Sequence, residues 1–332
     1  MRAALLTSVG HIRMDERERP QVGEDEVCIK VHACGLCGTD IHIFEGTFPA
    51  TPPLVLGHEY SGRVIEAGSS VRQVKPGDAV AVDPNIACGL CHFCRKGKIH
   101  LCERLTALGV HFDGGFQEFS KAPARQVYRL PESVPLSWGA MAEPVSCCLH
   151  GIDLAAIEPG DTVAILGAGA IGLIMLQLAK LAGASKIFVV EPNTRRQALA
   201  RKLGADLCWT PEGAAFRTLD GGGVDVCIEC SGTPGGFASA LEDAKRGGTV
   251  VVFGVSDQGL QTSISPFEVY YKELRIRGAF VNPNTFSRAL ELLATRKLCL
   301  DDILTRSVPL TNLQDAIVLW KTREELKILI QC

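Results

Sequence analysis

The segment 162–191 constrains the fold more than any other part of this sequence. It opens with an apolar run of strand length, 162–167, continues with apolar residues at helical spacing over 173–184, and closes with a second apolar run, 186–191. A strand, a turn, a helix and a second strand in this order form a βαβ unit, whose two strands lie parallel in one sheet. The sequence therefore predicts an α/β fold.

The turn inside this unit reads Gly-Ala-Gly-Ala-Ile-Gly, which has the spacing of the dinucleotide-binding fingerprint. Gly167 permits the tight turn, Gly169 lets the backbone approach a pyrophosphate, and Gly172 lets helix and strand pack closely. With Ala170 and Ile171 these residues open the helix, whose free N–H groups favour phosphate. The motif alone is weak, but its place between strand and helix indicates a nucleotide-binding loop.

Glu191 ends the second strand of the unit, about twenty residues after the glycines. A carboxylate there accepts hydrogen bonds from the adenosine ribose hydroxyls and repels a 2′-phosphate, so we expect NAD as the cofactor. Arg195 and Arg196 follow closely. They could bind that phosphate, which leaves NADP as the less favoured alternative, or form the exposed first turn of the next helix.

The alternation of strands and helices continues beyond this unit. The further segments are a helix at 195–204, a strand at 224–229, a helix at 236–244, and strands at 249–254 and 274–278. Parallel sheets of this kind bind ligands outside the carboxyl ends of their strands. Cys230, Gly254 and Val255 stand at the ends of two of these strands, and we expect them beside the nicotinamide.

The remainder of the chain has a different pattern. Up to about residue 145, short alternating runs separated by Gly, Pro and Asp turns predict β-strands. We therefore predict a mainly β domain at 1–145 and a doubly wound parallel sheet at 146–279. Residues 280–332, with helices at 284–296 and 312–322, return to the first domain.

Composition excludes several classes of protein. Net charge is −3 and no long basic run occurs, so nucleic acid is not an expected partner. The N-terminal apolar stretch is too short for a signal peptide. The run 162–184 is long enough for a membrane span, but its glycines, Gln177 and Lys180 favour a buried strand and helix. We expect a cytoplasmic protein with no membrane partner.

A second constraint comes from Cys37 and, further along, the adjacent pair His58 and Glu59. Thiolate and imidazole together favour zinc among the abundant metals. Three protein ligands leave a fourth position open for water or substrate, as in catalytic zinc sites. We therefore predict a catalytic zinc ion at these residues.

Four of the 14 cysteines are closely spaced. They are Cys88, Cys91, Cys94 and Cys102, in the pattern Cys-x2-Cys-x2-Cys-x7-Cys. In a reducing compartment this spacing indicates a closed structural zinc site rather than disulfides. Iron–sulfur clusters also use four cysteines, but with other spacings. A nucleic-acid-binding knuckle is disfavoured because the segment interrupts a longer β pattern. Two zinc ions per chain are therefore expected.

These motifs, in this order along nearly the whole chain, resemble those of the zinc-dependent medium-chain dehydrogenases. The segment 142–150, Ala-Glu-Pro-Val-Ser-Cys-Cys-Leu-His, resembles the polyol branch of that family, which includes sorbitol, xylitol and arabitol dehydrogenases. The resemblance implies a GroES-like catalytic domain, split in sequence around a Rossmann domain. It also implies a homo-oligomer, with a tetramer favoured and a dimer as the alternative.

The resemblance further implies roles for individual residues. Glu143 would reach the catalytic zinc directly or through water, unless it forms a salt bridge at the domain boundary. Asp40 would accept the second N–H of His58, cap a helix, or do both. Thr39 and the nicotinamide ribose would relay the substrate proton to His42, which is otherwise a surface histidine. A zinc-bound water or glutamate could take the place of that relay.

The reaction implied is the reversible oxidation of a secondary alcohol of a polyol or sugar alcohol to a ketone, with hydride transfer to NAD. Val281 stands where the sorbitol group carries an arginine, and 44–49 lacks the aromatic-rich loop of that group. A butanediol- or threonine-type dehydrogenase is the alternative enzyme. An NAD-binding sensor or structural protein is disfavoured because all four expected ligands of the catalytic zinc are present.

Overall fold

The computed structural model describes residues 1–332, except the side chain of Arg217, and falls into two compact units. Unit 1 combines Met1–Ser146 with Asn282–Cys332, and unit 2 is Cys147–Val281. The divisions predicted from the sequence lie at 145 and 280. One unit is mainly β and the other contains a parallel sheet with helices, which confirms the predicted α/β fold class.

Unit 1 consists mostly of strands. They are β1 (Arg2–Ser8), β2 (His11–Glu16), β3 (Glu26–Gly35), β4 (Leu54–Val55), β5 (Glu59–Ala67), β6 (Ala79–Val82), β7 (Asn85–Ile86), β8 (Thr106–Ala107), β9 (Phe119–Pro123), β10 (Val127–Arg129), β17 (Leu304–Pro309) and β18 (Lys327–Gln331). Its helices are α1 (Gly38–Glu45), α2 (His92–Arg95), α3 (Leu136–Gly139), α9 (Phe286–Ala294) and α10 (Leu313–Lys321), and α4 (Ala142–Ala155) runs across the division. Neither β17 nor β18 was predicted from the sequence.

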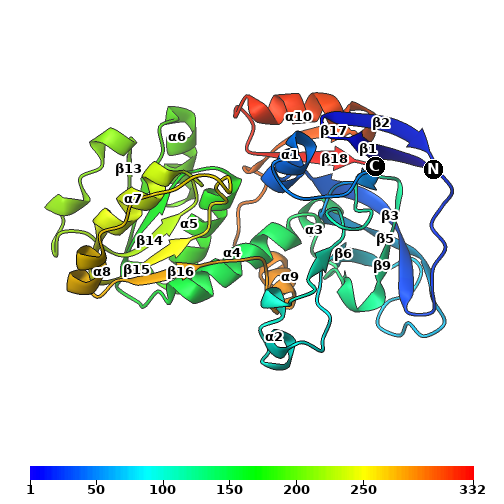
Figure 1. The fold of residues 1–332 in the computed structure, drawn as a ribbon, viewed down its shortest axis with the longest axis horizontal. Coiled ribbons are helices and arrows are strands. Elements are labelled where there is room, and N and C mark those ends of the chain that lie inside the picture. Colours follow the sequence, from blue (N-terminus) through cyan, green and yellow to red (C-terminus); the bar gives the residue numbers. More distant parts are fainter. The chain divides into compact units, whose positions relative to one another are not determined.

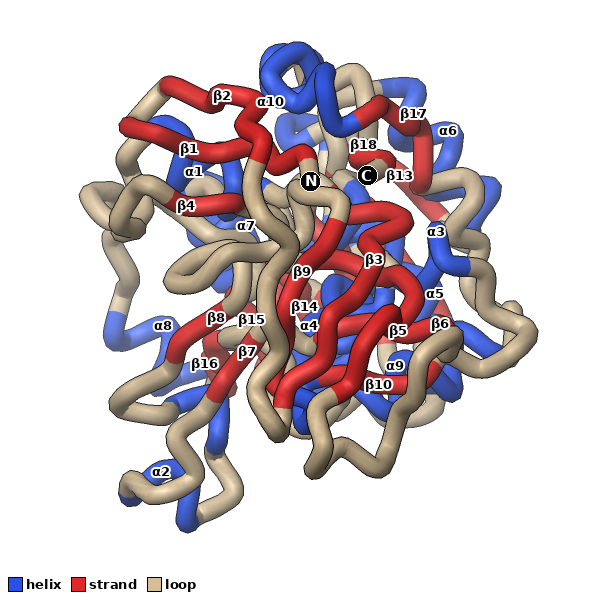
Figure 2. Tube along the Cα trace, turned by 90° about the vertical axis from the view of Figure 1, so that its right-hand side faces the viewer, coloured by secondary structure: helices blue, strands red, loops and turns tan.

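The main sheet of unit 1 has the strand order β10-β6-β5-β3-β18-β17, and β9 also pairs with β3 (Figure 2). In the middle of β3, Ile29 and Val31 are buried whereas Lys30 and His32 are exposed. This alternation lets that part of the strand bury one face in the hydrophobic core, and the flanking residues 27–28 and 33–35 are all buried. Because β3 lies between β5 and β18, it brings side chains from distant parts of the sequence together.

Unit 2 contains one parallel sheet. Its strands are β11 (Thr162–Leu166), β12 (Lys186–Val190), β13 (Leu207–Trp209), β14 (Val224–Glu229), β15 (Ala244–Val252) and β16 (Arg275–Gly278). Its helices are α5 (Ala170–Ala182), α6 (Thr194–Leu203), α7 (Pro234–Asp243) and α8 (Pro266–Lys272). The strand order is β13-β12-β11-β14-β15-β16 (Figure 1).

The strand order of this sheet changes direction between β11 and β14. Crossovers between parallel strands are right-handed, so the helices of the two halves cover opposite faces. Sheets with this change of strand order bind ligands outside the carboxyl ends of the central strands. This architecture is the doubly wound sheet that the sequence predicts.

The apolar run 162–184 divides into β11 and α5. A turn at Gly167, whose φ is +100°, separates them, and Gly183, at φ +106°, ends the helix in the left-handed conformation that glycine tolerates. Val163, Ala164 and Ile165 of the strand are fully buried. Among the described residues, no helix is long and apolar enough to cross a membrane.

Candidate active site

Helix α1 holds the first candidate ligand at its N-terminus. Cys37 is the N-cap residue, and Asp40 lies fully buried in the first turn. The Asp40 carboxylate accepts the Cys37 N–H through Oδ2 at 3.0 Å and the Gly57 N–H through Oδ1 at 3.1 Å. One buried carboxylate therefore fixes the start of α1 to the chain just before His58.

His58 and Glu59 lie where the chain enters β5, and both are buried. Nδ1 of His58 is 3.4 Å from Oδ1 of Asp40, so Asp40 is both a helix cap and a partner of the histidine. The ligand atoms of Cys37, His58 and Glu59 all lie within 4.8 Å of one another. The structure thus brings together the three residues that sequence spacing selected.

The electrostatics of this cluster favour a cation. Burial opposes a positive charge on His58, but the Asp40 carboxylate and the Cys37 thiolate outweigh burial and raise the pKa of His58 well above its usual value. Thiolate, imidazole and carboxylate are also a donor set that zinc accepts. The residues present therefore fit a zinc ion held by Cys37, His58 and Glu59.

Lys327, at the start of β18, is a site residue that the sequence analysis missed. Its ammonium group forms an ion pair with Oε2 of Glu59, and the two side chains are only 6% and 2% exposed. Burial lowers the pKa of Lys327, but Glu59 and Cys37 raise it more, so the lysine stays charged. The only sequence signal was a lone lysine opening the apolar run 327–330.

Gly35 of β3 makes this ion pair possible. It is the register partner of Glu59 on one side and of Leu329 on the other. A Cβ at Gly35 would overlap Oε2 of Glu59 and lie 3.0 Å from Cε of Lys327. Only glycine lets the two side chains meet across the intervening strand.

Glu143 is not part of this cluster. It is buried in the first turn of α4, and among the described residues the cluster of possible ligands is limited to Cys37, His58 and Glu59. Its charge nevertheless contributes to raising the pKa of Lys327, after the larger effects of burial, Glu59 and Cys37. The carboxylate therefore lies near enough to influence the site electrostatically.

Thr39 and His42 both belong to α1. Oγ1 of Thr39 is 3.9 Å from Sγ of Cys37. Nδ1 of His42 is 3.1 Å from Oγ1 of Thr47, and the histidine is half-buried. The threonine therefore lies beside a candidate ligand, whereas the histidine lies a turn further along the helix.

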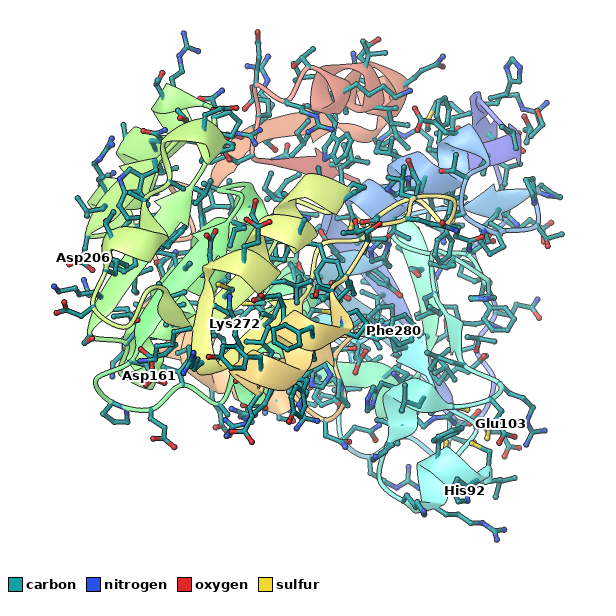
Figure 3. All side chains as sticks on the ribbon, turned by 60° about the vertical axis from the view of Figure 1, so that its left-hand side comes forward. His92, Glu103, Asp161, Asp206, Lys272 and Phe280 are labelled. Atoms are coloured by element: carbon teal, nitrogen blue, oxygen red, sulfur yellow. The ribbon has the colours of Figure 1, made fainter. Side chains whose placement is uncertain are left out.

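The four closely spaced cysteines form a second cluster in a lobe of unit 1 that carries α2 and extends away from the main sheet (Figure 2). Their sulfur atoms lie within 4.8 Å of one another. Figure 3 shows where this lobe lies by two of its other residues, His92 and Glu103. Backbone N–H groups of Leu90 and Cys91 donate to Sγ of Cys88 at 3.4 Å and lower its pKa to about 6. Four thiols arranged in this way fit a closed zinc site.

The glycine-rich loop of unit 2 has the geometry that nucleotide binding needs. A Cβ at Gly172 would overlap the carbonyl oxygen of Gly167, so helix and strand approach closely. A Cβ at Gly169 would meet no atom within 4 Å, so the backbone is open there. Ala170 and Ile171 form the first turn of α5, whose N-cap is Gly169.

The other candidate cofactor residues lie at the carboxyl edge of the same sheet. Glu191 is buried after β12, and its carboxylate accepts the N–H groups of Ala168 at 2.8 Å and Asn193 at 3.0 Å. Arg196 lies half-buried in α6. The remaining three follow β14 and β15: Cys230, Gly254 and the exposed Val255.

A site suited to an open zinc ion and a sheet suited to a dinucleotide are the parts of a metal-dependent dehydrogenase. Residues 23–132 match the alcohol dehydrogenase GroES-like domain, and residues 170–295 match the zinc-binding dehydrogenase domain. The chain belongs to the family of zinc-binding alcohol dehydrogenases.

Curated relatives cover most of this chain. D-arabinitol dehydrogenase 1 of Uromyces fabae is 34% identical over 94% of this chain and 91% of its own length. Sorbitol dehydrogenase of Bacillus subtilis is 33% identical over 99% of this chain and 97% of its own length. L-threonine 3-dehydrogenase of Caldanaerobacter subterraneus is 36% identical over 79% of this chain and 78% of its own length.

Solved structures match the whole chain. A zinc-binding dehydrogenase of Sinorhizobium meliloti, bound to NADP, is 42% identical, with a TM-score of 0.96, over 100% of this chain and 99% of that one. The 2R,3R-butanediol dehydrogenase of Bacillus subtilis is 29% identical, with a TM-score of 0.91 and the same coverage.

Proposed function

We propose that the protein oxidises a secondary alcohol of a polyol or sugar alcohol to a ketone and transfers the hydride to NAD. The observation that carries the proposal is the cluster of Cys37, His58 and Glu59, in a chain that also has a dinucleotide-type loop. Zinc bound by these residues would supply a Lewis acid that lowers the pKa of the substrate hydroxyl. The four cysteines of the lobe would hold a second, structural zinc ion.

The chain's own residues would orient the ligands and balance their charge. Asp40 holds His58 and Cys37 in place, and Lys327 neutralises Glu59 and fixes its position. We assign Glu143 a contact with the metal through water, since it is buried near the site but outside the ligand cluster.

The substrate proton would leave along α1. Thr39 lies next to Cys37 and is suited to pass the proton on, with the nicotinamide ribose as the next member. His42 would accept it at the end of the relay, and its contact with Thr47 would hold the ring in place. A histidine held in position suits general base chemistry near neutral pH.

NAD is the proposed cofactor because Glu191 fixes a carboxylate beside the glycine loop, where it would repel a 2′-phosphate. The similar structure from Sinorhizobium meliloti carries NADP, and Arg195 and Arg196 are the residues here that could accept its phosphate. Comparing kcat/KM for NAD and NADP tests the assignment. Equal values for the two cofactors would contradict it.

The proposed substrate class rests on the arabinitol and sorbitol dehydrogenases among the relatives. Initial rates of NADH formation with arabitol, xylitol, sorbitol, 2,3-butanediol and threonine test it. The proposal predicts the highest kcat/KM with a sugar alcohol. Activity with threonine alone, or with butanediol alone, would replace it with the alternative that the threonine and butanediol dehydrogenases represent.

The protein is also proposed to form a homo-oligomer, with a tetramer favoured over a dimer. β16 is the edge strand of the parallel sheet, and all of its residues are exposed. Unit 2 also has four exposed aromatic residues in the segment around this strand: Phe267, Tyr270, Tyr271 and Phe280. Figure 3 shows Phe280, together with Lys272 of the same unit. An unpaired edge with apolar neighbours suits a second copy across a two-fold axis.

None of the cysteines that the structure describes forms a disulfide, which suits a reducing compartment, and we place the protein in the cytoplasm. Sedimentation analysis of the purified protein tests the assembly. A monomer at micromolar concentration would contradict the proposed oligomer.

A further inference from the structure

Two buried carboxylates stand at the carboxyl edge of the parallel sheet in unit 2. Glu191 follows β12 and was selected by its distance from the glycine loop. Glu229, the last residue of β14, is only 1% exposed and no motif assigned it a role. Buried carboxylates usually have a partner, so the contacts of Glu229 indicate what it does.

The Glu229 carboxylate organises the loop that follows its own strand. Its Oε1 accepts the N–H groups of Ser231 at 2.6 Å and Gly232 at 3.0 Å, and also the Ser231 hydroxyl. The Ser231 oxygen is 2.9 Å from Oγ1 of Thr233, which accepts the Gly236 N–H at the start of α7. The loop is therefore folded around the carboxylate as far as the next helix.

The same residue also contacts the neighbouring loop after β15. The N–H groups of Phe253 and Gly254 donate to the Glu229 carbonyl oxygen at 3.0 and 2.8 Å. A Cβ at Gly254 would lie 2.7 Å from Oε2 of Glu229 and would overlap the Gly232 nitrogen. The Ser256 hydroxyl closes the contact by donating to the Gly232 carbonyl at 2.8 Å. The two loops are thus one hydrogen-bonded structure with Glu229 between them.

These loops include three of the candidate cofactor residues, Cys230, Gly254 and Val255. We propose that Glu229 is a positioning residue for the nicotinamide half of the cofactor: it fixes the loops 230–232 and 254–256 in the conformation that binds the ring. Loops already ordered before binding lose less conformational freedom when the ligand arrives, so affinity is higher. This inference rests on the proposed function, because it requires a nicotinamide dinucleotide in this sheet.

The test compares Glu229→Ala and Glu229→Gln with wild type, using Glu212→Gln, an exposed glutamate of the same unit, as the control. Dissociation constants are measured for NADH and for ADP-ribose, which lacks the nicotinamide ring. Glu229→Ala should weaken NADH binding about tenfold or more, because charge-assisted hydrogen bonds to both amides are lost, and should leave ADP-ribose binding within about twofold. Glu229→Gln keeps an acceptor oxygen and should restore most of the affinity.

If Glu229→Ala does not fold, Ser231→Ala, which removes only the hydroxyl, should still weaken NADH binding more than ADP-ribose binding. A folded Glu229→Ala that binds NADH like wild type would overturn the inference. An equal loss of affinity for NADH and ADP-ribose would also overturn it, as would a lowered melting temperature with unchanged NADH affinity. Either result would indicate that Glu229 only stabilises the fold. Failure of wild type to bind either dinucleotide would instead contradict the proposed function.

Discussion

The two candidate metal sites of unit 1 differ in what holds their ligands. Cys37 caps α1 and the adjacent His58 and Glu59 lie at the start of β5, and the buried Asp40 and Lys327 hold these separate elements in place. The lobe ligands come from one short segment, three of its cysteines are half-exposed, and loop amides are their main partners. The fold forms the first site, whereas we expect a bound metal ion to hold the second together.

The largest effect should follow from Cys37→Ala. Loss of the zinc ligand should reduce NADH formation roughly 10³-fold or more, because the Lewis acid contributes several kcal/mol to catalysis. The unfolding midpoint should change little, since Asp40 and Lys327 remain. Cys299→Ala, at an exposed cysteine, is the control. Zinc-dependent turnover near the wild-type rate in Cys37→Ala would show that the central cluster is not the catalytic site.

Cys88→Ala should act on stability instead. The lobe should lose its zinc and become disordered, because metal binding supplies most of its folding free energy. Zinc content should fall by about one ion per chain, hydrogen exchange should rise within 88–105, and turnover should persist. Loss of turnover in a fully stable and fully assembled Cys88→Ala protein would contradict this division of roles.

Lys327→Met tests whether the central site carries its own cation. It leaves Glu59 as a buried charge without its ion-pair partner, which should destabilise the zinc-free protein by about 3 kcal/mol. Zinc should reduce the loss, since the metal can neutralise the same carboxylate. Chemical denaturation with and without zinc measures both values, and Lys327→Arg is the control that keeps the charge. An equal loss of stability with and without zinc would argue against the idea that Lys327 and zinc share the Glu59 carboxylate.

The smallest effect is expected for Asp40→Asn. The amide oxygen can still accept one of the two backbone N–H groups, but the amide nitrogen cannot accept the other, and the side chain no longer balances the charge of His58. Zinc affinity at the central site should fall roughly 10- to 100-fold, as for other residues that orient a ligating histidine. Chelator competition measures it, with Asp220→Asn at an exposed aspartate as the control. Unchanged affinity would mean that Asp40 serves α1 alone.

The sequence predicted those parts of the molecule in which the signal is local. The βαβ unit at 162–191 and the four-cysteine lobe each lie within one short segment, where spacing determines geometry. Cys37 and His58 are distant in sequence, but thiolate and imidazole chemistry links them. Asp40 was predicted as a cap or as a histidine partner, and the structure has both contacts.

What the sequence could not predict depends on strand pairing over long distances. The ion pair of Lys327 with Glu59 needs β18 and β5 on either side of β3, and needs Gly35 between them. None of these residues is unusual in its own segment. Glu229 is similar: it reads as the end of an apolar strand, and its role follows only from the loops that β14 and β15 bring together.

A zinc ion on Cys37, His58 and Glu59 should enable oxidation of the alcohol. Titrating zinc into zinc-depleted protein while following the rate of NADH formation with arabitol measures this dependence. We expect almost no rate without zinc and a rise that saturates as the central site fills, with no such rise in Cys37→Ala. Full activity in protein shown to contain no zinc would contradict it.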